Sequence, residues 1–177
     1  MINRIILLLF ICLVWGQKEY NIKHIVEQSG IYKKRISDEI VNGKVYQMTD
    51  DMKVPLGKMK NGKKEGIWTE WYPDKRKLEE TYKHGMLDGA VSLFYMTGQR
   101  EWRHTYNNGT FDGLWTYWYN NGQKMKEGSF ECGDSTGIWI WWDKNGHVKK
   151  EKTFKKRKNG IWTNYNEYVL IEDVKEP

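Results

Sequence analysis

Apolar and aromatic side chains recur along this chain in short alternating runs, each introduced by a glycine. The clearest runs begin with the same triplet: Gly66-Ile67-Trp68, Gly113-Leu114-Trp115, Gly137-Ile138-Trp139 and Gly160-Ile161-Trp162. Gly89-Ala90-Val91 is a weaker copy, and Gly43-Lys44-Val45 is interpreted as a degenerate first copy. From Gly66 onward the repeated glycines are 23, 24, 24 and 23 residues apart. Such regular self-similarity indicates a repeat protein.

Each repeat is predicted to be a β-hairpin. In the third copy, Gly113 to Tyr119 alternates as a strand, residues 120–123 form a turn, and Lys124 to Phe130 alternates again. The Asn-Gly pair in this turn readily supplies the positive φ that tight hairpin turns require. Further turns are predicted at Asn61-Gly62, His84-Gly85 and Asn108-Gly109.

A lone hairpin is marginally stable in water, so successive hairpins are expected to stack as an antiparallel meander. The sequence therefore predicts an all-β fold, an elongated and twisted sheet of antiparallel hairpin repeats with a small N-terminal cap. Composition agrees, because the chain has ten Trp residues and a single alanine, Ala90. Trp, Tyr, Val, Ile and Thr favour strands, whereas a helical protein would be richer in alanine.

Four regions are expected along the chain. Residues 1–16 read as a cleaved signal peptide, with Arg4 ahead of an apolar run from Ile5 to Trp15. Residues 17–55 are expected to form the cap, with strands at 24–32 and 41–48 and a weakly indicated helix at 34–40. Residues 56–165 hold the repeats, and 166–177 a last strand and a charged tail. The protein is therefore expected to be exported: periplasmic, outer-membrane-associated or secreted.

The two cysteines indicate no disulfide framework, because removal of the signal peptide leaves only Cys132. Cys132 is expected in a turn. Cys12 lies inside the signal peptide and leaves lipidation as an open alternative, although Ile11 before it is larger than a lipoprotein signal prefers.

Strand alternation distributes the repeat positions between two faces of the sheet. Counted from each repeat glycine, positions +2 and +6 share one face, while positions +1 and +5 share the other. The +2 rings either pack on their neighbours above and below, the simpler interpretation, or line a recognition groove. Position +4 varies most between copies and is the better candidate for partner contact. The candidate partner-binding residues are Glu70, Tyr72, Leu93, Tyr95, Tyr117, Tyr119 and Trp141.

Charge adds little to this picture. The formal net charge is +6, from 29 Lys and Arg against 23 Asp and Glu. The surface could meet anionic lipid. The longest basic run, however, has four residues, Lys155 to Lys158, so a scattered, solubilising surface is the simpler interpretation. Nucleic acid is not an expected partner, and the oligomeric state is left open.

No catalytic constellation is recognisable. The four histidines have no helical metal-ligand partner, and neither a nucleophile elbow nor a phosphate loop occurs. His84 and His104 fall near the ends of adjacent second strands, where a chance pair is the simpler interpretation than a metal site. Glu79, Glu80, Glu127 and Glu151 recur with the repeat, which favours cross-strand pairing with lysine over glycosidase chemistry. The chain is thus expected to be non-catalytic, with no cofactor and no metal.

The repeat also resembles a known family. Residues 66–72 and 113–124, which read Gly-Ile-Trp-Thr-Glu-Trp-Tyr and Gly-Leu-Trp-Thr-Tyr-Trp-Tyr-Asn-Asn-Gly-Gln-Lys, resemble MORN-type repeats in their bacterial variant form. Residues 25–34 with Gly43-Lys44-Val45 resemble the N-terminal segment of the exported YwqK-type family, which carries an antitoxin label. The resemblance implies scaffolding, membrane association or protein contacts. The leading hypothesis is an envelope or secreted protein-binding module. The alternatives are an antitoxin or immunity-like protein, an anionic-lipid-associating module and a carbohydrate-binding module.

Overall fold

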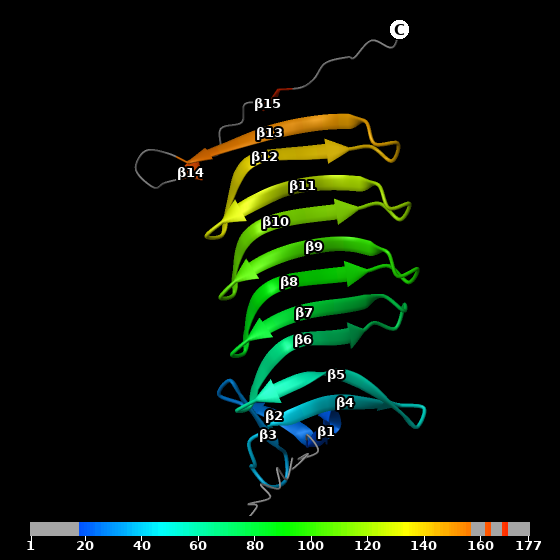
Figure 1. Ribbon diagram of the computed structural model, residues 1–177, viewed down its shortest axis with the longest axis vertical. Coiled ribbons are helices and arrows are strands. Elements are labelled where there is room, and N and C mark those ends of the chain that lie inside the picture. Colours follow the sequence, from blue (N-terminus) through cyan, green and yellow to red (C-terminus); the bar gives the residue numbers. More distant parts are fainter. Residues whose placement is uncertain (1–17, 157–161, 164–167, 170–177) are drawn as a thin grey trace, which may run out of the picture.

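The computed structural model describes residues 18–156, 162–163 and 168–169, and almost all regular structure within them is β-strand (Figure 1). The expected signal peptide, Cys12 and most of the fifth repeat lie outside these residues. Two short strands, β2 (Ile25–Gln28) and β3 (Ile31–Lys34), form a separate hairpin. The strands of the main sheet are β1 (Glu19–Asn21), β4 (Gly43–Thr49), β5 (Met52–Lys60), β6 (Lys63–Trp71), β7 (Lys77–Lys83), β8 (Met86–Phe94), β9 (Arg100–Asn107), β10 (Thr110–Trp118), β11 (Lys124–Glu131), β12 (Asp134–Trp142), β13 (Val148–Lys156), β14 (Trp162–Thr163) and β15 (Tyr168–Val169).

The main sheet is a meander in which each strand from β4 to β13 pairs with the next one along the chain. These pairs are all antiparallel, and the strands stack along the long axis of the molecule (Figure 1). β15 pairs with β13, at Glu151↔Val169 and Lys152↔Tyr168. The predicted all-β fold of hairpin repeats is therefore confirmed. No helix among the described residues is long and apolar enough to cross a membrane.

Two kinds of turn alternate along the sheet. Two-residue turns with positive φ at both positions connect one repeat to the next, at Asn61-Gly62, His84-Gly85, Asn108-Gly109 and Cys132-Gly133. Positive φ at both positions gives the turn a twist that matches the flanking strands. Longer turns close each hairpin; in the third repeat the Tyr119 N–H donates to the Gln123 carbonyl, and Gly122 has a φ of 84°. The predicted turns are confirmed, including the place of Cys132.

Each repeat glycine lies near the beginning of its strand, as the fourth residue of β6, β8, β10 or β12. Gly66, Gly89, Gly113 and Gly137 all have positive φ, and the pairing register shifts beside three of them. A β-bulge of this kind bends the strand and increases its twist. β8, β10 and β12 curve strongly at their beginnings (Figure 1). At Gly113 the bend brings the residue two positions before the glycine over the +2 residue: the rings of Phe111 and Trp115 meet edge to face with 4.7 Å between centroids.

The N-terminal cap differs from its prediction in detail. The strand expected at residues 24–32 is the β2–β3 hairpin, because Ser29 and Gly30 both adopt positive φ and reverse the chain. The helix weakly indicated at 34–40 is wrong, since this segment is a turn followed by an isolated bridge between Lys33 and Ile40. The strand expected at 41–48 is β4, which belongs to the main sheet, so the boundary expected at residue 55 falls inside β5.

The cap covers the first edge of the sheet. β1 runs parallel to β4, and the Lys44 N–H donates to the Lys18 carbonyl at 2.9 Å. Gly43 permits this approach, because a Cβ there would lie 2.0 Å from the same carbonyl oxygen. A 3-10 turn at Ile22–His24 then leads into β2. Buried apolar side chains join the cap to the first repeats: Tyr20, Ile25, Val41, Val45, Met59 and Trp68.

Candidate functional site

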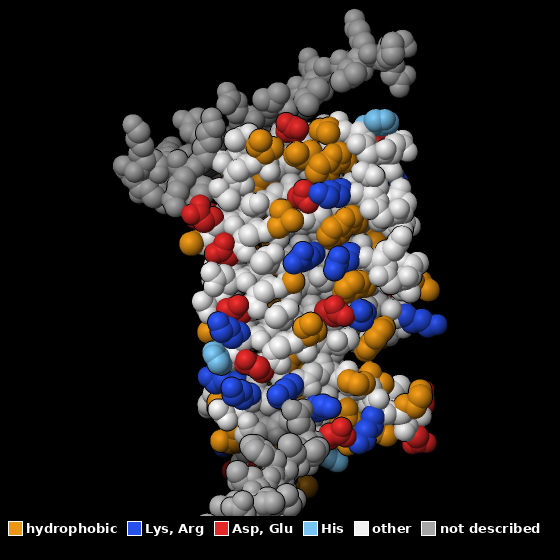
Figure 2. All heavy atoms as spheres, in the orientation of Figure 1, with side chains coloured by type: hydrophobic (Ala, Val, Ile, Leu, Met, Phe, Trp, Pro, Cys, Tyr) orange, Lys and Arg blue, Asp and Glu red, His pale blue; other side chains and the backbone are white. Residues whose placement is uncertain are grey.

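The two faces of the sheet are chemically different. We call the face that carries Trp68, Val91, Trp115 and Trp139 at position +2 the Trp face, and the opposite face, with Ile67, Ala90, Leu114 and Ile138 at position +1, the Ile face. On the Ile face, Ile67, Leu114 and Ile138 are exposed. On the Trp face, Trp68, Val91 and Trp139 are buried even though the sheet is a single layer over most of its length. Figure 2 shows one broad side of the molecule, where hydrophobic side chains alternate with charged ones along the long axis.

The indoles of Trp68 and Trp139 are buried because each lies over the second strand of the preceding repeat. Trp139 lies on the backbone of Gly128, where an added Cβ would be 2.0 Å from the indole. Trp68 lies in the same way over Gly57, and its Nε1–H donates to the Lys58 carbonyl at 3.0 Å. The prediction that these rings pack on neighbouring repeats is confirmed.

His104 occupies the position that Gly128 holds in the next repeat. Its ring is stacked between Trp102 and Trp115, with centroid distances of 4.2 and 3.7 Å and interplanar angles of 13°. The side chain is buried and its Nε2 has no hydrogen-bond partner among the described residues. Burial, followed by the nearby Lys126 charge, lowers the pKa of His104 to about 4. His104 is thus a neutral ring in the aromatic stack at pH 7, a role that sequence reasoning missed.

His84 lies apart from this stack, in an exposed turn where its Nδ1 is 3.7 Å from a Glu65 carboxylate oxygen. Among the residues that the structure describes, no three His, Cys, Asp or Glu side chains are placed to hold a metal ion. The recurring glutamates meet lysines, but mostly within their own strand and not across strands as predicted. Glu79 pairs with Lys77 of β7 at 2.8 Å, and Glu127 pairs with Lys124 of β11 and accepts a hydrogen bond from the Thr116 hydroxyl across the hairpin. Glu80 does approach a lysine of the neighbouring strand, Lys64, at 3.9 Å.

Two of the three candidate tyrosines at position +6 link consecutive repeats. The Tyr95 hydroxyl donates to the Trp118 carbonyl at 2.9 Å, and the Tyr119 hydroxyl donates to the Trp142 carbonyl at the same distance. Both bonds span 23 residues, one repeat. Tyr72 lies near the Arg76 guanidinium, 5.7 Å from the ring centroid. The hydroxyls of Tyr95 and Tyr119 therefore donate hydrogen bonds to the backbone of the next repeat within the sheet.

The candidates at position +4 lie on the Trp face in three different settings. Glu70 is exposed, whereas Leu93 is only 6% exposed, because it packs between Leu78 and Trp102 on the adjacent strands. Leu93 therefore has almost no surface to offer a partner. Tyr117 and Trp141 are half-buried and belong to the cluster described next.

Tyr117, Lys126, Trp141 and Lys150 form what we call the aromatic–lysine patch. Lys126 is the cross-strand neighbour of both Tyr117 and Trp141, and Lys150 is the other neighbour of Trp141. The Lys126 ammonium lies 5.2 Å from the Trp141 centroid and 4.6 Å from that of Trp139, and Lys150 approaches Trp141 at 5.1 Å. Burial, and then repulsion from Lys150, lower the pKa of Lys126. The patch presents cations over aromatic faces, an arrangement suited to an anionic group beside an apolar one.

Comparison with known proteins agrees with this architecture. No curated protein sequence matches the chain. Residues 64–84, 111–131 and 135–156 match the family described as MORN repeat variant. Each match covers a hairpin or most of one, and the unmatched second repeat, with Val91 in place of tryptophan, has the same hairpin geometry. Three stretches of the chain, each a hairpin or most of one, are thus similar to MORN repeats of the variant type.

Proposed function

We propose that this chain is a non-catalytic binding module, exported to the cell envelope or secreted, whose aromatic–lysine patch contacts a partner protein. Export is supported by the basic, then apolar, then small-residue pattern of residues 1–16. An antitoxin or immunity-like role would be one form of such binding, in which the partner is a toxin.

The observation that carries the proposal is the setting of Lys126. Its ammonium group is half-buried between two indoles, and none of the described carboxylates forms an ion pair with it. A partly desolvated cation without a carboxylate is unfavourable, and a partner's carboxylate would offset this cost. Tyr117 and Trp141 beside it supply the aromatic surface that dominates many binding interfaces. The patch therefore fits a partner segment with an acidic side chain next to an apolar one.

Site-specific photo-crosslinking in the natural host tests this directly. A photoreactive phenylalanine analogue replaces Tyr117 or Trp141 in the patch, or Met96 in an exposed turn as the control. We expect an adduct of one protein mass from positions 117 and 141, its loss when Lys126→Gln is added, and no such adduct from position 96. Absence of an adduct at both patch positions would contradict the proposal. Binding to phosphatidylglycerol vesicles that is lost with Lys126→Gln would reassign the patch to lipid.

A further inference from the structure

The ladder between β5 and β6 stops early. These strands pair only at Lys58↔Glu65, Met59↔Lys64 and Lys60↔Lys63, next to their shared turn. The other three junctions between successive hairpins in the described chain, β7–β8, β9–β10 and β11–β12, are paired almost to the far end of the strands; β11 and β12, for example, pair from Glu131↔Asp134 to Lys126↔Trp141. Figure 1 shows β5 and β6 diverging beyond their turn. The opening between residues 52–57 of β5 and 66–71 of β6 is here called the slot.

The β6 side of the slot is an unpaired strand edge. At the closed end of the β6–β7 hairpin, the Tyr72 N–H donates to the Arg76 carbonyl, so Tyr72 faces β7. Antiparallel strands alternate, which turns the N–H and C=O groups of Trp71, Thr69 and Ile67 away from β7 and toward the slot. At the repeat position of Thr69, Thr116 of β10 faces a partner strand, β9, where it pairs with Arg103. Backbone donors and acceptors of β6 that border the slot therefore have no partner strand. In β10, the corresponding group of Thr116 is paired with β9.

The β5 side explains why the slot stays open. Pro55 has no N–H, so it cannot donate a ladder hydrogen bond to β6. A register shift between Val45 and Tyr46 leaves Leu56 as an extra residue in β5, and such a bulge turns a strand away from its neighbour. β4 and β5 also close with a two-residue turn at Asp50-Asp51, unlike the longer turns of the repeats.

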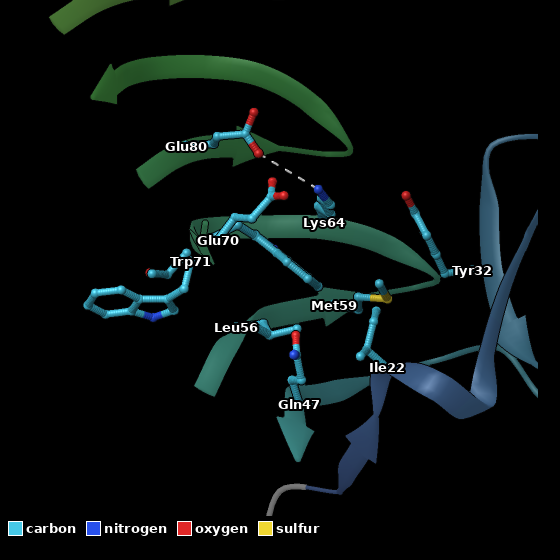
Figure 3. Close-up of a pocket in the computed structure, with 11 residues that line it drawn as sticks. Ile22, Tyr32, Gln47, Leu56, Met59, Lys64, Glu70, Trp71 and Glu80 are labelled. Atoms are coloured by element: carbon cyan, nitrogen blue, oxygen red, sulfur yellow. Dashed lines mark ion pairs between the residues drawn. The ribbon is translucent and has the colours of Figure 1, made fainter. Parts of the chain in front are cut away.

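Two cavities flank the slot, and both are lined by Leu56 and Thr69. The first, of about 320 Å³, lies on the Trp face, and Figure 3 shows Leu56 and Gln47 on one side of it and Glu70 and Trp71 on the other. The second, of about 410 Å³, lies on the Ile face and is lined by Val45, Pro55 and Ile67 among others. A strand in the slot would direct alternate side chains into these two cavities.

We propose that the slot binds an extended peptide segment of a partner protein, which adds a strand to the free edge of β6. Backbone hydrogen bonds to Ile67, Thr69 and Trp71 hold the segment, and the two cavities select its side chains. The peptide carries apolar residues at the positions that face Pro55 and Ile67. It carries Lys or Arg at a position that faces Glu70, which forms no ion pair with any other described residue. This site lies at the opposite end of the sheet from the aromatic–lysine patch and does not depend on it.

Amide hydrogen exchange of the full chain tests the free edge first. We expect the N–H groups of Ile67, Thr69 and Trp71 to exchange rapidly and that of Thr116, which has the repeat position of Thr69 and pairs with Arg103 of β9, to be protected. Protection of the first set without added peptide overturns the proposal, because another part of the chain or a second copy then fills the slot. A dependence of that protection on protein concentration would identify the second copy.

Binding is then tested with a phage-displayed library of linear twelve-residue peptides. We expect selected peptides with apolar residues at alternate positions, whose affinity falls at least tenfold with Ile67→Lys and is unchanged by Ile138→Lys. The two isoleucines are matched, because both occupy position +1 and are 63% and 58% exposed. N-methylation of alternate peptide amides should abolish binding, while N-methylation of the intervening amides should not. The proposal would be overturned if peptide affinity did not respond to Ile67→Lys and N-methylation, or if Ile67→Lys and Ile138→Lys lowered it equally. The variant Lys126→Gln separates this binding from that of the aromatic–lysine patch, because it should leave peptide affinity unchanged.

Discussion

Lowering the pH should destabilise this protein through His104. The side chain is 7% exposed and its folded-state pKa is about 4, against about 6.5 for an unperturbed histidine. The unfolded chain therefore binds the proton more tightly than the folded one. The contribution of neutral His104 to the free energy of unfolding is fully present above about pH 6.5. It is lost as the pH falls from about 6.5 toward about 4, and below that it changes no further. Linkage between these two pKa values gives a loss of about 2 kcal/mol between pH 7.5 and pH 5.

The matched control is His104→Phe, which keeps a ring between Trp102 and Trp115 but cannot be protonated. Urea unfolding followed by tryptophan fluorescence at pH 7.5 and pH 5 gives the free energy of unfolding of both proteins. We expect the parent to lose about 2 kcal/mol more than the variant over this interval. The exposed His24, His84 and His147 are present in both proteins, so their contributions cancel. An equal loss in the two proteins, or an NMR titration of His104 with a midpoint near 6.5, would refute the reasoning.

Two further substitutions test how the repeats are joined. Gly128→Ala should lower the free energy of unfolding by about 1–3 kcal/mol, because its Cβ would overlap the Trp139 ring. The same change should cost less in a Trp139→Ala background, as measured by urea unfolding. Equal costs in the two backgrounds would show that the ring is not the obstacle. Tyr119→Phe should cost about 1 kcal/mol by removing the hydrogen bond to the Trp142 carbonyl, and Tyr95→Phe should cost about the same, since its bond to Trp118 has the same length; no change in the urea midpoint for either variant would argue against these links.

The local chemistry of the repeat allowed much of the fold to be predicted from sequence. Glycine and asparagine at fixed offsets specified the turns, and Asn61, Asn108 and the glycines that follow them have positive φ as expected. Alternation placed the +2 tryptophans on one face, and a 23- or 24-residue period required them to stack. These features depend on residues close together in the chain, which is why a pattern could reveal them.

The candidate site was predicted less well, because its character depends on which residues lie across the strands. The three residues Glu70, Leu93 and Trp141 all have position +4 in their repeats, yet their settings differ. Glu70 is an exposed carboxylate, Leu93 is buried, and Trp141 belongs to the aromatic–lysine patch. The neighbours Leu78 and Trp102 bury Leu93, whereas Lys126 and Lys150 flank Trp141. No offset counted along one strand could distinguish these settings.

The sequence by itself determined the hairpin, its period and the stacking of its rings, since turn geometry and alternation are local properties. Only the tertiary structure showed that the Tyr95 and Tyr119 hydroxyls form hydrogen bonds between repeats. It also showed that His104 is a neutral ring in the aromatic stack and that β5 and β6 diverge. The physical reason is that burial and strand pairing are set by side chains on the adjacent strands, which the spacing along one strand does not reveal. At the first repeat, a missing N–H at Pro55 and a bulge at Leu56 change the path of β5, so residues with an ordinary repeat pattern come to border an opening.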